Sequence, residues 1–198
     1  MQQKLTITLA VSAAAATKGA GTPVDLSSYF NLYGIYTDGS VYSTGGLDGL
    51  GNSYSANLLT PARVGDKVLF NFGPANEPDA VASSGQSIAL PAGKFADLAL
   101  FATGVEGDQT GQTVTVNYTD GTSTKFVQSF SDWYTPGNFP NEFEAVAMAY
   151  RNEDNGTKDK RIFNLYAYRF ALNPAKTVQS VTLPDNADVI VLAATLVK

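Results

Sequence analysis

Apolar and polar side chains alternate with a period of two along most of this chain, and that pattern predicts strands. The segment at 112–118, QTVTVNY, alternates cleanly, reaches a turn at Asp120 and Gly121, and continues at 124–130, which predicts a β-hairpin. The segment at 95–105 is largely apolar and is expected at the centre of the structure. Strands are predicted at residues 4–11, 67–72, 87–90, 95–105, 112–118, 124–130, 143–151, 161–170, 176–183 and 189–197.

The predicted elements indicate an all-β fold. At least eight strands, short turns and no helix beyond one turn at 56–59 favour a two-sheet antiparallel β-sandwich of the jelly-roll type. Neither a repeat nor a boundary is visible, so residues 1–198 are expected to form a single domain. The start, 4–11, has strand periodicity rather than the continuous apolar core of a signal peptide. We interpret the chain as a module excised from a longer multidomain protein, with its last strand near its first.

One segment, 24–59, departs from the strand pattern. It contains five tyrosines together with many Gly, Asn and Asp residues, and it has no Lys, Arg or Glu. It is too polar and too rich in glycine for a helix and too aromatic for a plain linker. Loops of this length in a compact domain usually bind something or hold an ion. We therefore expect an ordered, functional surface loop.

Several short motifs carry a resemblance in this and later segments. They are DLSSYFN (25–31), GI (34–35), LDGLGNSYSANLL (47–59), SGQSIALP (84–91), YTDGT (118–122), SDW (131–133), LYAY (165–168) and VTLPDN (181–186). Their order resembles a family of carbohydrate-binding modules found beside bacterial glycoside hydrolases and polysaccharide lyases. The resemblance covers about residues 24–196.

That resemblance implies a secreted, extracellular bacterial β-sandwich, similar to galactose-binding-like jelly rolls and without catalytic activity. The chain departs from the family pattern at Leu32, Tyr33 and the insertion 36–46. The ligand contacts of relatives therefore do not transfer to this sequence.

Composition narrows the function. The net charge of −5 and the pI near 4.6 argue against nucleic acid and anionic membranes as partners. The lack of cysteine excludes disulfides and thiolate zinc sites, and the lack of histidine removes the commonest general base. Glu142 and Glu144 could supply a carboxylate pair, but two solvated charges at the start of a strand are the simpler interpretation. We expect no enzyme activity.

Sugar binding needs flat aromatic faces beside planar hydrogen-bonding groups, and the predicted loops are rich in tyrosine. The alternative is that these rings only pin a loop to the sandwich, with Trp133 packing beneath it. Arg151 and Arg161 could bind acidic groups, although salt bridges to nearby Glu153, Asp154 or Asp159 are the simpler expectation. The candidate carbohydrate-binding residues are Tyr33, Tyr36, Tyr42, Tyr54, Trp133, Tyr134 and Arg151.

A structural calcium ion is the one cofactor that the sequence suggests. Calcium takes six to eight oxygen ligands, and a glycine-rich loop can supply them. The candidate ligands are Asn31, Asp38, Asp48 and Asn52, although no EF-hand spacing is present. The alternative is that these side chains form Asx turns with their own backbone.

The sequence thus predicts a non-catalytic carbohydrate-binding module that targets a secreted polysaccharide-degrading enzyme to its glycan, with an acidic polymer such as xanthan as one candidate. The alternative is a structural β-sandwich that packs against a neighbouring catalytic domain and orients it. The expected partners are a polysaccharide or oligosaccharide and the catalytic domain of the parent enzyme. Neither nucleic acid nor a membrane is expected as a partner, and we expect a monomer.

Overall fold

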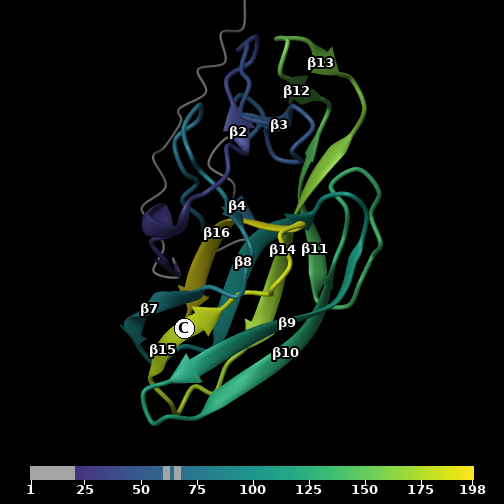
Figure 1. The fold of residues 1–198 in the computed structure, drawn as a ribbon. Helices are drawn as coiled ribbons and strands as arrows, with labels where there is room; N and C mark the ends of the chain where they lie inside the picture. The colour runs from purple at the N-terminus through teal and green to yellow at the C-terminus, as the bar shows by residue number, and fades with distance from the viewer. Residues whose placement is uncertain (1–20, 60–62, 65–67) are drawn as a thin grey trace, which may run out of the picture.

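The chain folds into stacked β-sheets with very little helix (Figure 1). The structure, a computed structural model, describes residues 21–59, 63–64 and 68–198. The strand predicted at 4–11 lies outside the described residues, as does the start of the strand predicted at 67–72. Within the described parts, no helix has the length and apolar character needed to cross a membrane.

The main sheet has six strands in the order β1-β16-β8-β14-β11, with β6 also paired to β16. Its three long central strands pair antiparallel and are almost entirely buried. The strands are β1 (Thr22–Pro23), β6 (Val81–Ala82), β8 (Asp97–Gly104), β11 (Glu142–Met148), β14 (Phe163–Ala171) and β16 (Val189–Val197).

The second sheet has four antiparallel strands in the order β10-β9-β15-β7, and its inner face packs on the main sheet. These strands are β7 (Ser87–Gly93), β9 (Gln109–Tyr118), β10 (Ser123–Phe130) and β15 (Val178–Thr182). Along β9, buried Val114, Val116 and Tyr118 alternate with the more exposed Thr113, Thr115 and Asn117. One face therefore meets the core and the other meets solvent, as expected for an antiparallel sheet.

A third layer, the cap sheet, has the order β13-β12-β3-β2 and stands at the top of Figure 1. Its strands are β2 (Ile35–Tyr36), β3 (Asn52–Ser55), β12 (Arg151–Glu153) and β13 (Lys158–Asp159). Smaller elements complete the fold: η1 (Ser27–Tyr29), and the paired strands β4 (Arg63–Val64) and β5 (Val68–Leu69).

The cap sheet and its loops cover the second face of the main sheet. Ile35, Leu47 and Tyr54 from this layer form a core cluster with Phe101 of β8 and Leu165 of β14. Residues next to these on the same strands face the opposite way, into the core shared with the second sheet. The central strands are therefore apolar on both faces because both faces are covered.

The predicted all-β sandwich and the single domain are confirmed, and most strands begin and end close to the residues expected. The hairpin appears as β9 and β10, and the last strand matches its predicted range of 189–197. The strand predicted at 143–151 is instead divided between β11 and β12, and the residues predicted as a turn of helix at 56–59 form a hydrogen-bonded turn. The segment 152–160, between the strands predicted at 143–151 and 161–170, contains part of the cap sheet. The sequence did not predict this third layer.

Candidate recognition site

Three tyrosines of the long segment form an internal stack rather than an outward platform. The ring centres of Tyr36 and Tyr42 lie 3.7 Å apart with 7° between the ring planes, and the Tyr33 ring stacks on Tyr36 with its centre 6.3 Å away. The Tyr42 hydroxyl lies 2.9 Å from Ser53 Oγ, and burial raises the pKa of Tyr42 to about 12. Tyr36 is 5% exposed. These contacts pin the loop to the cap sheet, which corrects the expectation that Tyr36 displays a free ring face.

Tyr54 and Trp133 lie deeper still. Their side chains are 0% and 3% exposed, and the rings meet edge to face with centroids 5.3 Å apart. The Tyr54 hydroxyl donates a 2.7 Å hydrogen bond to the carbonyl oxygen of Asn164 on β14. Both rings therefore hold the cap layer on the main sheet, and neither offers a surface to a sugar. The alternative in which Trp133 packs beneath the loop is the arrangement observed.

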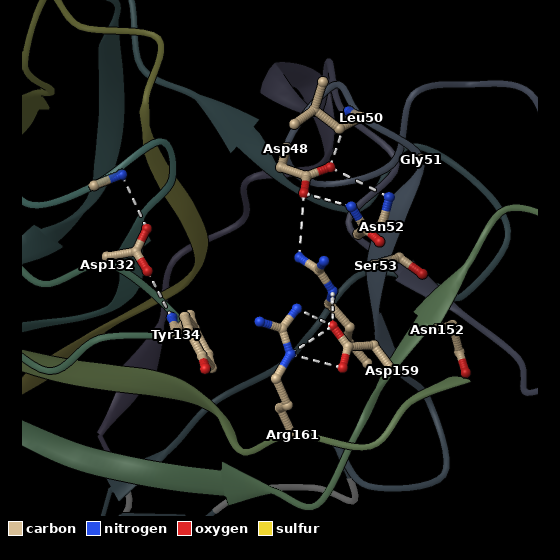
Figure 2. Close-up of polar contacts among 12 residues, drawn as sticks. Asp48, Leu50, Gly51, Asn52, Ser53, Asp132, Tyr134, Asn152, Asp159 and Arg161 are labelled. Atoms are coloured by element: carbon tan, nitrogen blue, oxygen red, sulfur yellow. Dashed lines mark hydrogen bonds and ion pairs between the residues drawn. The ribbon is translucent and has the colours of Figure 1, made fainter. Parts of the chain in front are cut away.

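Tyr134 is the exposed ring among the predicted residues, with 45% of the residue accessible. Asp132 fixes its backbone, because Asp132 Oδ1 accepts a hydrogen bond from the backbone N–H of Tyr134 at 2.8 Å (Figure 2) and another from that of Thr135 at 3.1 Å. The Arg161 guanidinium carbon lies 4.5 Å from the centre of the Tyr134 ring, and the Phe163 ring lies 5.4 Å away. Tyr134 is therefore a partly exposed residue whose ring is held in place by Arg161 and Phe163.

Arg151, on β12, is mostly buried and has both aromatic and acidic neighbours. Its side chain is 16% exposed, and its guanidinium carbon lies 4.6 Å from the centre of the Phe163 ring and 5.0 Å from that of Trp133. Nε lies 3.2 Å from Asp159 Oδ2, an ion pair outside hydrogen-bond angles, and Nη1 lies 3.5 Å from Asp48 Oδ2. The guanidinium is thus fixed in one orientation before any ligand arrives.

Asp159 joins Arg151 to Arg161 (Figure 2). Arg161 Nε donates to Asp159 Oδ1 and Oδ2 at 2.8 and 3.0 Å, and Nη2 makes a further close contact with Oδ2. The hydrogen bond from Arg161 is the main cause that lowers the pKa of Asp159, and Arg151 adds to it. The salt bridge expected between these arginines and Asp159 is confirmed. We call Arg151, Asp159, Arg161, Tyr134 and Phe163 the arginine rim.

Comparison with known families gives one match that covers nearly the whole domain. The family model described as the AziU2-like beta-sandwich domain matches residues 20–198. The chain belongs to the AziU2-like β-sandwich domain family. No curated protein matches the chain. The family supports the predicted β-sandwich, and the resemblance to carbohydrate-binding modules attached to glycoside hydrolases goes beyond what this match supports.

In this AziU2-like domain, the four predicted calcium ligands do not form a common oxygen cage. Asp38 contacts Lys158 Nζ, Tyr150 Oη and Ser55 Oγ at 2.5–2.6 Å, and Asn31 Oδ1 accepts from the backbone N–H of Ala82. Only Asp48 and Asn52 have directly bonded side chains, at 2.8 Å. Over residues 21–59, 63–64 and 68–198, no group of three or more acidic side chains gathers in a geometry suited to a metal ion. The Asx-turn alternative holds for Asp48, whose Oδ1 accepts from the backbone N–H groups of Leu50 and Asn52, whereas Asp38 and Asn31 bond to residues distant in sequence.

Other members of the polar network were missed from the sequence. Phe163 packs against both guanidiniums of the arginine rim and was missed, whereas Asp159 was expected only as a salt-bridge partner and not as a site residue. Glu142, weighed above as a catalytic carboxylate, accepts hydrogen bonds from Ser131 Oγ at 2.6 Å and from the Tyr168 hydroxyl at 2.7 Å. It anchors the loop that carries Tyr134. The dense charge at 158–161 was the available signal for the rim, but it does not specify which charges pair.

Proposed function

We propose that this AziU2-like domain is a non-catalytic recognition module that binds carbohydrate at the arginine rim. The observation that carries the proposal is the pairing of a half-exposed ring, Tyr134, with the exposed guanidinium of Arg161 on a rigid β scaffold. An aromatic ring can contact the C–H face of a sugar while a guanidinium donates to its oxygens. Such a module would tether a polysaccharide-degrading enzyme to its substrate.

The site is smaller than the sequence suggested. Tyr36, Tyr54 and Trp133 are buried, and the partly buried Tyr33 and Tyr42 stack on Tyr36, so Tyr134 is the most exposed ring among the candidates. A single ring and a few donors give weak binding, which repeated sites along a polymer can raise. We therefore expect dissociation constants for short oligosaccharides on the order of millimolar.

A non-catalytic role is supported by how the carboxylates are used. Asp79 has its pKa raised by burial to about 8, a value typical of a general acid, but the residue is 0% exposed and accepts hydrogen bonds from Gly34 and Ile35. Glu142 is held by Ser131 and Tyr168. Neither carboxylate is free to meet a substrate.

Affinity electrophoresis against a panel of neutral and acidic polysaccharides tests the proposal. We expect retardation by at least one polymer, and about ten-fold weaker binding for Tyr134→Ala. Phe143→Ala is the matched control, because Phe143 is a comparably exposed ring, at 53%, on the edge strand β11. Correctly folded protein that binds no glycan in the panel would contradict the proposal.

A second candidate, docking on a neighbouring protein domain, is favoured by exposed aliphatic side chains in the same region. Leu50 is 71% exposed beside Asp48, and Ile162 is 61% exposed beside Arg161. Exposed apolar groups around arginine and tyrosine are typical of protein interfaces. Absence of glycan binding together with lower solubility than that of a Leu50→Ser, Ile162→Ser variant would favour this alternative.

A further inference from the structure

We infer that the group recognised at the arginine rim is an anion, a carboxylate or sulfate carried by an acidic polysaccharide. This inference rests on the carbohydrate-binding function proposed above and names the ligand class. It depends on three features of the rim: its charge balance, its unused donors, and the difference between Arg161 and an otherwise similar arginine.

The two guanidiniums of the rim share one close carboxylate. Asp159 serves two guanidiniums, those of Arg151 and Arg161. The second carboxylate, Asp48, accepts hydrogen bonds from Leu50 N, Asn52 N and Asn52 Nδ2 at 2.8–3.2 Å and reaches Arg151 only at 3.5 Å. The three other donors to Asp48 are uncharged, and its ion pair with Arg151 is the longer of the two that Arg151 makes. Arg161, at the exposed end of the rim, therefore pairs with a carboxylate that it shares with a second guanidinium, on a chain whose net charge is −5.

Arg161 retains donors for a ligand. A guanidinium has five N–H groups, and Asp159 engages those on Nε and Nη2. Among the residues that the structure describes, no carboxylate or carbonyl accepts from Nη1, which Figure 2 shows on the side of the guanidinium away from Asp159. The Tyr134 side chain is the other polar neighbour of this guanidinium. An anionic oxygen can therefore bind at Nη1 without displacing Asp159.

The side chain that carries these donors is already in position. The Arg161 guanidinium lies against the Tyr134 ring at 4.5 Å and within 5.7 Å of Phe163. Contacts with aromatic faces restrict an otherwise mobile side chain, so less conformational entropy is lost when a ligand binds. A sugar ring carrying the anion would then lie beside the exposed part of Tyr134.

Arg169 provides an internal comparison. Its side chain has the same exposure as that of Arg161, 51%, and it also pairs with one aspartate, Asp97. Arg169 and Asp97 form an isolated pair, whereas Asp159 is shared with Arg151. No aromatic ring is recorded against Arg169 in the described chain, whereas Arg161 contacts two. Exposure and ion pairing are matched, so Arg169→Gln is the control for Arg161→Gln.

Matched polymer pairs test the inference. Polygalacturonate is compared with its methyl-esterified form, and dextran sulfate with dextran, by affinity electrophoresis and calorimetry at low salt. We expect binding to at least one charged member and at least ten-fold weaker binding to its uncharged counterpart. The carboxylate and sulfate arms identify which anion is recognised. Raising the salt concentration to about 0.5 M should weaken binding, because surface charges are screened.

Variants locate the binding to the rim. Arg161→Gln should lower the affinity for the charged polymer about ten-fold, Arg161→Lys should lower it less, and Arg169→Gln should leave it unchanged. Asp159→Asn should raise the affinity several-fold, because both guanidiniums lose their shared counter-charge. Circular dichroism and thermal unfolding check that each variant is folded.

The outcomes separate the two proposals. Equal binding of charged and uncharged polymers overturns the anion inference and leaves the carbohydrate-binding function standing. Binding of the charged polymer that Arg169→Gln reduces as much as Arg161→Gln also overturns the inference. Binding of no polymer of either kind by folded protein overturns the proposed function itself.

Discussion

A single buried carboxylate fixes the start of the long segment to the sandwich. Asp79 accepts hydrogen bonds from the backbone N–H groups of Gly34 and Ile35 at 2.7 and 3.0 Å, and it is 0% exposed. A Cβ atom at Gly34 would lie only 3.2 Å from Asp79 Oδ1 and 2.9 Å from a Leu47 methyl group, so a larger residue there would force these side chains to shift. Asp79 thus connects the approach to β6 with the strand β2.

Asp79 makes the free energy of unfolding depend on pH. Its pKa is raised by burial to about 8, against about 4 in an unfolded chain, so the folded protein holds a proton that the unfolded chain releases between these values. The stability from this group is complete below about pH 4 and is lost as the pH rises through about 8. We expect denaturant titrations to show a decrease on the order of a few kcal/mol between these limits. An Asp79→Asn variant should show a flatter profile, and an unchanged slope would contradict the assignment.

Trp133 gives a direct test of whether the predicted aromatic platform faces solvent. It is the only tryptophan in the chain and is 3% exposed. We expect a blue-shifted fluorescence emission and slow quenching by acrylamide in the native protein, and a red shift with fast quenching in denaturant. Fast quenching of the native protein would mean that the ring is displayed, as a sugar platform requires.

At the scale of elements, the cap sheet is held together by a charged cross-link. Asp38, in the loop after β2, contacts Lys158 of β13, Tyr150 before β12 and Ser55 of β3 at 2.5–2.6 Å. Burial opposes its ionisation, but these hydrogen bonds outweigh burial and hold the pKa of Asp38 well below its usual range. One side chain therefore ties three segments of the cap together.

Replacing Asp38 should loosen the cap while leaving the sandwich intact. We expect Asp38→Asn to lower the free energy of unfolding by about 1 to 2 kcal/mol, since three hydrogen bonds to a charged acceptor are weakened and the site is partly solvated. Hydrogen exchange should accelerate at the backbone amides of β3 and β12 and stay unchanged in β8 and β16.

The control is Asp120→Asn, which removes an exposed pair with Lys176 at the turn between β9 and β10, outside the cap. It should leave exchange in the cap unaffected. Uniform acceleration across all sheets in Asp38→Asn would show instead that the cap does not open separately.

At the scale of the whole molecule, the main sheet is shared by two cores. Leu100 and Phe101 are consecutive residues of β8, both 0% exposed, and they point into different core clusters. Leu100 packs toward the second sheet, and Phe101 packs toward the cap layer, where it meets Phe70 and Phe72. Disrupting either core therefore uncovers one face of the same central strands.

This sharing predicts a single cooperative unfolding transition. We expect Leu100→Ala and Phe101→Ala each to lower the free energy of unfolding by about 3 to 5 kcal/mol, the usual cost of a large cavity in a core. Calorimetry should show one transition that shifts as a whole in both variants. Val127→Ala, at a residue 75% exposed on β10, is the control and should change stability by less than about 0.5 kcal/mol. A separate early transition in Phe101→Ala alone would show that the cap layer unfolds by itself.

The strands and the sandwich could be predicted from the sequence because buried and exposed positions follow a regular pattern along each strand. Alternating Val114, Val116 and Tyr118 reveal a half-buried strand, and the apolar runs at 95–105 and 189–197 reveal central ones. The strands of the cap sheet show no such pattern in the sequence. These strands are two to four residues long, too short for a period, and the central pairing of the sheet, β12 with β3, joins residues about a hundred positions apart.

The sequence by itself thus determined that this chain is an all-β domain, because side-chain periodicity is a local property that burial imposes on each strand. It could also list which rings and charges were available for a site. Only the tertiary structure decided that Tyr54 and Trp133 turn inward while Tyr134 turns outward, since the direction of these side chains depends on partners distant in sequence. The sharing of Asp159 by Arg151 and Arg161 is likewise a consequence of folding, because the sequence offers several acidic side chains nearby and only their distances in space decide which one pairs with each arginine.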